Sequence, residues 1–174
     1  MTNGNHEGHG GFFVGNMKDV VVPDLPYKPN VVIVYVGTND MIFSEVSSAV
    51  RAMQELVSYL NTNLPSALIV ISKLFIATDP KVQAKIDEFN EYITRDNLGG
   101  NNNVVIADLS DALTPSDLFD DGEHPIDSGY QEMALVFYHV LTKNIKRIQE
   151  PTAVEGLEDV TSCNGPPELL VVQN

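Results

Sequence analysis

The stretch KPNVVIVYVGTND, residues 28–40, decides the fold class. Its apolar run, residues 31–36, is rich in β-branched side chains and ends at Gly37. A short apolar run without polar alternation is typical of a strand that is buried on both faces, as the strands of parallel sheets are. The polar tetrapeptide GTND begins at Gly37, so we expect it at the carboxyl end of that strand.

Helical and extended patterns alternate along the chain beyond this stretch. Apolar residues recur at helical spacing over residues 46–60, and a second buried strand is expected at residues 67–74. Asp79 and Pro80 predict the start of another helix, because aspartate is a favoured N-cap and proline fits the first helical position. Apolar residues at helical spacing follow, which supports this helix.

A third strand at residues 104–109 and a last helix capped by Asp127 complete the alternation. This order predicts a parallel sheet with right-handed crossovers, in a three-layer α/β/α sandwich. We assign this single domain to residues 1–149. Residues 150–174 are acidic and interrupted by proline and glycine, so we expect a flexible tail. Its last part, ELLVVQN at residues 168–174, has the composition of an edge strand.

The composition excludes several kinds of partner. The formal net charge of −14 and the isoelectric point near 4.4 argue against nucleic acid and anionic membranes, because such partners need clustered Lys and Arg. No apolar run approaches the length that spans a bilayer, and the first residues lack the pattern of a signal peptide. The single cysteine, Cys163, cannot form an internal disulfide and leaves the localisation unknown.

Polar residues suited to acid–base chemistry follow two of the expected strands. Ligands of open parallel sheets bind beyond the carboxyl ends of the strands, where Asn39 and, past a loop, Asp121 and His124 are expected. A histidine base needs a group that holds its imidazole, and a carboxylate three residues earlier in a turn can reach Nδ1. The Asn39 amide and a backbone N–H of the turn at Gly11 can both donate hydrogen bonds to an oxyanion.

Each of these features also has a simpler interpretation. The turn at Gly11 is compatible with an ordinary loop, and Asn39 with a turn that enters a helix, in which Asp40 orders the loop. The acidic residues 120–123 are compatible with solvated surface or a weak site for a divalent cation. Residues 6–9, HEGH, lack the second turn of the HExxH zinc motif and favour a solvated loop.

Three blocks in order resemble the SGNH hydrolases, also called GDSL-type esterases and lipases. EGHGGFF at residues 7–13 is similar to the second block of that family, VGTND at residues 36–40 to the third, and DGEHP at residues 121–125 to the fifth. The sequences around the third and fifth blocks are most similar to the branch of the family that acts on carbohydrate esters, including acetyl xylan esterases. The likeness covers roughly residues 6 to 148 and implies a flavodoxin-like parallel sheet.

The resemblance also implies roles for the candidate residues. Gly11 and Asn39 correspond to the oxyanion donors, Asp121 to the acid of a catalytic triad and His124 to its base. The implied substrate is a small-molecule or carbohydrate ester, and the implied mechanism needs no metal and no organic cofactor. Relatives in this branch are often secreted, which makes a secreted protein one possibility.

The first block of the family, a Gly-Asp-Ser motif that carries the nucleophilic serine, has no counterpart in the 174 residues. From this we expect a domain that is truncated at its N-terminus and inactive by itself. In the family's strand order, 2-1-3-4-5, it would lack two strands and leave residues 31–36 as an unpaired edge. The alternative is a non-catalytic module on the same scaffold, which binds carbohydrate or another partner.

Overall fold

The computed structural model describes residues 6–99, 102–150 and 169–173. Its strands are β1 (His6–Gly8), β2 (Val31–Tyr35), β3 (Leu68–Ser72), β4 (Val104–Ala107) and β5 (Leu169–Gln173). Its α-helices are α1 (Met17–Val20), α2 (Thr38–Phe43), α3 (Val46–Asn63), α4 (Pro80–Tyr92) and α5 (Asp127–Lys143). Short 3₁₀ turns are η1 (Val14–Asn16), η2 (Val22–Tyr27), η3 (Pro115–Asp117) and η4 (Ile145–Arg147).

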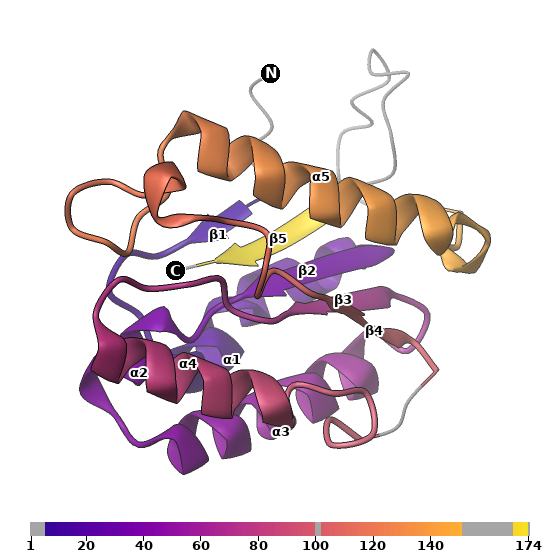
Figure 1. Ribbon diagram of the computed structural model, residues 1–174. Coiled ribbons are helices and arrows are strands. Elements are labelled where there is room, and N and C mark those ends of the chain that lie inside the picture. The colour runs from indigo at the N-terminus through magenta and orange to yellow at the C-terminus, as the bar shows by residue number, and fades with distance from the viewer. Residues whose placement is uncertain (1–5, 100–101, 151–168, 174) are drawn as a thin grey trace.

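The five strands form one parallel sheet in the order β1-β5-β2-β3-β4. Helix α5 covers one face of the sheet, and α1 to α4 lie on the other (Figure 1). The predicted three-layer α/β/α sandwich with a parallel sheet is therefore confirmed. The three strands and three longer helices that the sequence predicted are all present, with strand ends that differ by one to a few residues.

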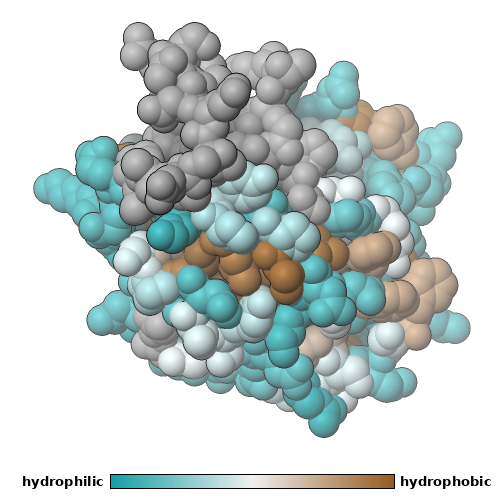
Figure 2. All heavy atoms as spheres, turned by 180° about the vertical axis from the view of Figure 1, so that it is seen from behind, coloured by the Kyte–Doolittle hydropathy of each residue, from teal (hydrophilic) through white to brown (hydrophobic). Residues whose placement is uncertain are grey.

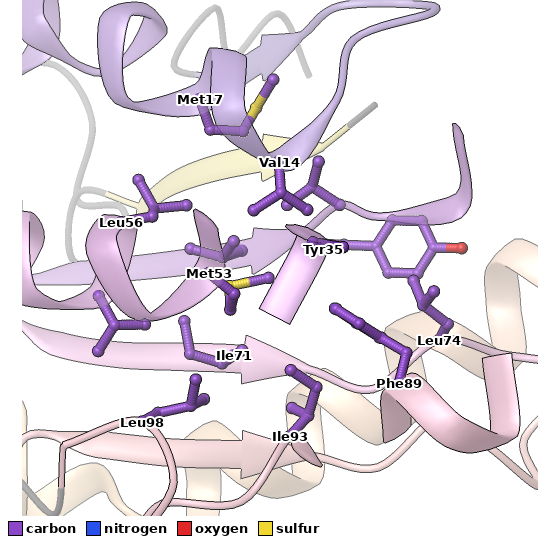
Figure 3. Close-up of a cluster of buried hydrophobic side chains, with 14 of the residues drawn as sticks. Val14, Met17, Tyr35, Met53, Leu56, Ile71, Leu74, Phe89, Ile93 and Leu98 are labelled. Atoms are coloured by element: carbon purple, nitrogen blue, oxygen red, sulfur yellow. The ribbon is translucent and has the colours of Figure 1, made fainter. Parts of the chain in front are cut away.

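Alternate residues of the buried strands face two separate cores. The larger core joins one side of β2 and β3 to α3 and α4, and Figure 3 shows members of it from all four elements. The smaller core joins the other side of β2, β3 and β4 to α5. Its buried members are Val31, Ile33, Leu68, Val70 and Ala107, and partly buried residues, most of them in the helix, pack against them. Both faces of β2 and β3 are covered, which explains their continuous apolar sequences.

The helix starts agree with the sequence in one case and differ in another. Asp79 accepts the N–H groups of Lys81 and Val82, so the predicted cap of α4 is confirmed. For α5 the predicted cap is wrong, because Ile126 occupies the N-cap position and Asp127 is the first helical residue. In that first turn the Asp127 carboxylate still has a favourable interaction with the helix dipole.

The C-terminal residues correct two expectations. Residues 150–174 were expected to be a flexible tail with at most an edge strand, but Leu169–Gln173 forms β5 inside the sheet, between β1 and β2. Residues 31–36 were expected to be an unpaired edge, but β2 pairs with β5 along its whole length. The physical reason is that an exposed ladder of N–H and C=O groups beside β2 is best satisfied by another strand. The remainder of the tail, residues 151–168 and 174, lies outside the described residues.

The surface agrees with the acidic composition. Seen from behind, hydrophilic residues predominate, with apolar residues gathered near the middle of that face and others towards the right (Figure 2). Within the described ranges, no helix has both the length and the apolar character needed to cross a membrane.

Replacing Val171 with proline tests the position of β5. Val171 lies opposite both His6 and Ile33, so proline would remove a backbone N–H from an interior strand. We expect Val171→Pro to lower the free energy of unfolding by about 3 kcal/mol, measured by urea denaturation. Val171→Thr is the matched control, because it keeps the N–H and the β-branched shape. Equal midpoints for the two variants would show that β5 is not part of the sheet.

Candidate active site

All four predicted site residues lie at the same end of the sheet. Because the strands are parallel, their carboxyl ends meet along one edge, which we call the rim. Gly11 is in the segment that follows β1, Asn39 is in the first turn of α2 after β2, and the turn with Asp121 and His124 follows β4. The loop that carries this turn reaches α5 at the left of Figure 1, near the carboxyl end of β5.

The DGEHP turn holds the imidazole of His124 against Asp121. One carboxylate oxygen of Asp121 accepts the backbone N–H groups of Glu123 and His124, each at 2.9 Å. The other lies 3.0 Å from Nδ1 of the imidazole. The N–H of His124 first, and then that of Glu123, hold the pKa of Asp121 below its usual range. Asp121 thus stays ionised and orients the ring, which leaves Nε2 for proton transfer.

A close contact fixes this turn to the loop after β3. Gly122 has a φ of +74°, in the left-handed region that favours glycine. A Cβ at this position would overlap the hydroxyl of Thr78. The N–H of Thr78 also donates to the carbonyl of Gly122 at 3.0 Å. The backbone conformation and the lack of space therefore both require glycine here.

Asp117 holds the rest of the segment between β4 and α5 in place through hydrogen bonds. Its Oδ2 accepts the hydroxyl and the N–H of Thr114, at 2.7 and 3.0 Å, and its Oδ1 accepts the hydroxyl of Ser128 at 2.9 Å. These bonds, those from Thr114 first, lower the pKa of Asp117. Its carbonyl accepts the N–H of Ile126 at 2.9 Å. The start of α5 is thus tied to the loop on which His124 lies.

The side chain of Asn39 contacts the segment that carries Gly11, the other predicted oxyanion donor. Its Nδ2 donates to the carbonyl of Phe12 at 3.0 Å, which uses one of the two amide hydrogens. Phe12 is the neighbour of Gly11, whose φ is +83° and beside which a Cβ would meet no atom within 4 Å. The second amide hydrogen of Asn39 and the backbone beside Gly11 are therefore parts of one open region of the rim.

Asp40 forms a second bond between the same two segments. It is buried, and its Oδ2 accepts the N–H of Val14 at 2.9 Å. Burial raises the pKa of Asp40, and the hydrogen bond from Val14 partly offsets this effect. The expectation that Asp40 orders the loop is confirmed, since it joins the segment after β1 to the segment after β2.

Tyr35, the last residue of β2, lies next to the GTND segment. Its hydroxyl lies 3.4 Å from Oγ1 of Thr38, and its buried ring stacks on Phe75. Burial raises the pKa of Tyr35, the contact with Thr38 lowers it, and the phenol of Tyr130 raises it further. Tyr130 follows His124 closely and lies in the first turn of α5.

Two pairs of predicted residues are thus held by direct contacts: Asp121 with His124, and Asn39 with the backbone beside Gly11. The sequence analysis did not identify Thr78, Asp117 or the carbonyl of Phe12 as parts of the site. The glycine of DGEHP was the one available signal, since a glycine between polar residues often marks a left-handed turn. The contact between this turn and Thr78 joins residues far apart in sequence and has no local signature.

The profile of the GDSL-like lipase/acylhydrolase family matches residues 3–132, which is more than half of the chain. The chain belongs to this family. The resemblance inferred from the three blocks is therefore confirmed, and with it the expectation of an SGNH-type esterase scaffold.

Individual relatives give a finer comparison. A multidomain esterase from Ruminococcus flavefaciens is 23% identical over 93% of this chain, which spans only 24% of that protein. The crystal structure of a family 3 carbohydrate esterase from Talaromyces cellulolyticus has a TM-score of 0.72 and 25% identity, covering 83% of this chain and 73% of that one. A mutant acetyl esterase crystallised with acetate ion has a TM-score of 0.69, with the same identity and coverage.

Alanine at Gly122 tests the fit of the DGEHP turn. Gly99 is the matched control, because it also has a positive φ, +100°, but nothing lies within 4 Å of its Cβ position. Backbone strain should cost both variants about 1–2 kcal/mol. We expect Gly122→Ala to lose clearly more stability in urea denaturation, because of the overlap with Thr78. Adding Thr78→Gly should recover the excess, whereas equal losses at the two glycines would contradict this packing.

Asp40 variants test the bond between the two segments. Asp40→Ala leaves the Val14 N–H without its acceptor and should cost about 1–3 kcal/mol of unfolding free energy. Asp40→Asn keeps an acceptor and cannot ionise. Because burial raises the folded pKa of Asp40, its contribution to stability is greatest below the ordinary pKa of an aspartate and declines as the pH rises through the folded pKa. The wild type should therefore lose stability relative to Asp40→Asn as the pH rises above the ordinary pKa of an aspartate; a pH-independent difference would contradict the raised pKa.

Proposed function

We propose that this rim is the acid–base and oxyanion part of a serine esterase that removes acyl groups, acetyl groups above all, from carbohydrates. The observation that carries the proposal is the contact between His124 and Asp121 at the same end of the sheet as Asn39 and Gly11. A base held by a carboxylate, beside amide and backbone donors, is the arrangement that acyl transfer requires.

In the proposed reaction a serine hydroxyl attacks the ester carbonyl. Nε2 of His124 takes the proton of the hydroxyl and then gives it to the departing alcohol, while the Asp121 carboxylate stabilises the imidazolium. The amide of Asn39 and a backbone N–H at Gly11 donate to the oxyanion of the tetrahedral intermediate. Water then attacks the acyl-serine by the same steps, and the acid is released. The chain's residues supply every part except the serine.

Two observations support a carbohydrate as the alcohol part of the ester. Exposed aromatic residues occur in the segments of the rim, namely Phe12, Phe119 and Tyr130. Aromatic side chains with polar groups nearby are the usual lining of small-molecule sites, and their flat faces suit the apolar face of a sugar ring. Two relatives with solved structures at 25% identity are a carbohydrate esterase and an acetyl esterase.

The missing nucleophile determines the expected activity of the 174 residues. None of them belongs to a Gly-Asp-Ser motif. Loss of a triad serine lowers turnover by about 10⁶ in comparable enzymes and leaves a residual rate from the oxyanion donors and from binding. We therefore propose that this chain by itself hydrolyses esters only at such a residual rate.

The residual rate can be measured with p-nitrophenyl acetate. We expect slow hydrolysis that His124→Ala lowers but does not reduce to the rate in buffer, because the imidazole no longer activates water while the oxyanion donors remain. His139→Ala is the matched control, since this exposed histidine lies far along α5. Equal hydrolysis by the His124→Ala and His139→Ala variants would show that His124 is not the base of this reaction.

Asn39→Ala tests the role of the oxyanion donor independently of the base. In any form of the protein that carries the serine, we expect a kcat lower by roughly 10²-fold or more with little change in KM, because the donor acts mainly in the transition state. Steady-state kinetics on acetylated xylo-oligosaccharides would measure both constants. An unchanged kcat would remove Asn39 from this role.

The lack of a Gly-Asp-Ser motif also favours a second candidate, a non-catalytic module that binds carbohydrate. Titration calorimetry with acetylated and deacetylated xylo-oligosaccharides distinguishes the two candidates. An esterase site should prefer the acetylated ligand. Binding that is indifferent to the acetyl group, together with no hydrolysis that depends on His124, would favour the module.

A further inference from the structure

An exposed phenylalanine lies one helical turn from the proposed oxyanion donor. Phe43 is the last residue of α2, and its side chain, 72% exposed, is the most exposed of the large apolar side chains in the described ranges. Asn39 precedes it by four residues in the same helix. Side chains at positions i and i+4 share one face of a helix, with Cβ atoms about 5–6 Å apart. Phe43 and the Asn39 amide therefore lie on the same face of α2.

The segment after β1 contacts both of these residues. The carbonyl of Phe12 accepts a hydrogen bond from Asn39 at 3.0 Å. The ring of the next residue, Phe13, meets the ring of Phe43 edge to face, with centroids 6.5 Å apart and planes at 65°. The N–H of Phe13 donates to Oδ1 of Asn16 at 2.8 Å, which holds its backbone. Phe13 and Phe43, which we call the aromatic pair, are therefore fixed relative to the oxyanion donor.

The aromatic pair is not an isolated apolar spot on the surface. Phe12, whose side chain is 37% exposed, directly precedes Phe13, so three phenylalanine side chains gather beside one polar site. Single exposed apolar residues are common on proteins, whereas a group of them next to a polar site marks a surface that binds something. The contact with Phe13 leaves most of the Phe43 side chain in solvent, so packing within the fold does not account for this residue.

We propose that Phe43, supported by Phe13, is a stacking platform for a sugar ring next to the ring that carries the acyl group, so that the site recognises a neutral oligosaccharide rather than a single sugar. This inference rests on the proposed function, in which the ester carbonyl lies at Asn39. The apolar face of a sugar ring packs on an aromatic face, and Phe43 is exposed enough to offer one.

The size of an acetyl group excludes it as the partner of the aromatic pair. Its methyl carbon lies one C–C bond, about 1.5 Å, from the carbonyl carbon. Phe43 lies about 5–6 Å from Asn39 along the helix, so the alcohol part of the ester is the part that extends to it. An anionic sugar is disfavoured, because the face of an aromatic ring is partly negative and the chain has a formal net charge of −14.

The first test uses the absence of tryptophan from the 174 residues. Phe43→Trp keeps a flat aromatic side chain and places a single fluorophore in the proposed subsite. Tyr138→Trp is the matched control, because Tyr138 is 64% exposed but lies about 16 Å along α5 from the start of that helix. We expect xylotetraose to shift the emission of Phe43→Trp and not that of Tyr138→Trp, and xylose to shift neither.

Two results of this titration would overturn the proposal. The first is an emission of Phe43→Trp that does not change up to the highest soluble concentration of xylotetraose. The second is an emission that shifts with protein concentration in the absence of sugar, which would assign the aromatic pair to an interface between copies of the chain.

Titration calorimetry measures the contribution of the Phe43 ring. We expect Phe43→Ala to lower the affinity for xylotetraose roughly three- to ten-fold and to leave the weaker binding of xylose unchanged, because a single ring is held at the ester position. Tyr138→Ala should bind both sugars as the wild type does. Urea denaturation should give the same midpoint for Phe43→Ala and the wild type, since the ring is mostly exposed. Equal affinities of these two proteins for xylotetraose would overturn the proposal.

Two further outcomes separate the subsite from the proposed function. Binding of xylotetraose that depends on Phe43, without preference for the acetylated ligand and without hydrolysis that depends on His124, would support the subsite and overturn the esterase function. Hydrolysis of p-nitrophenyl acetate that depends on His124, without any contribution of Phe43 to the binding of xylotetraose, would support the esterase function and overturn the subsite.

Discussion

The parallel alignment of all five strands is the constraint on which the rest of the structure depends. Parallel strands end at one edge, so residues that are far apart in sequence become neighbours wherever they follow a strand. Gly11, Asn39 and His124 each come after a different strand, and no local interaction could bring them to one end of the molecule. The buried faces of β2 and β3, covered by helices on both sides, hold this alignment.

Backbone hydrogen bonds, more than side-chain pairs, give the site its shape. Asp121 binds two N–H groups in addition to the imidazole, Asp40 binds the N–H of Val14, and Asn39 binds the carbonyl of Phe12. Such bonds fix polar side chains relative to the backbone and not only relative to one another. They explain how Asp121 and His124, both exposed to solvent, can keep a defined geometry, as the proposed catalysis requires.

The chain has the scaffold of an esterase, but its C-terminal residues form an interior strand of the sheet that the sequence did not predict. Family membership and the relatives of known structure agree with a site for ester chemistry, while the strand next to β2 comes from the C-terminal residues.

The sequence by itself determined the fold class, the helix start at Asp79 and the three family blocks, because each depends on a local pattern: continuous apolar runs, helical spacing, or neighbouring residues in one turn. It also allowed the pairing of Asp121 with His124 to be predicted, since both lie in a single turn. Only the tertiary structure decided that Leu169–Gln173 lies between β1 and β2, that Phe12 orients Asn39, and that Thr78 leaves no space for a side chain at Gly122. These contacts join distant segments, and a sequence records no local preference for a partner that is reached only when the chain folds.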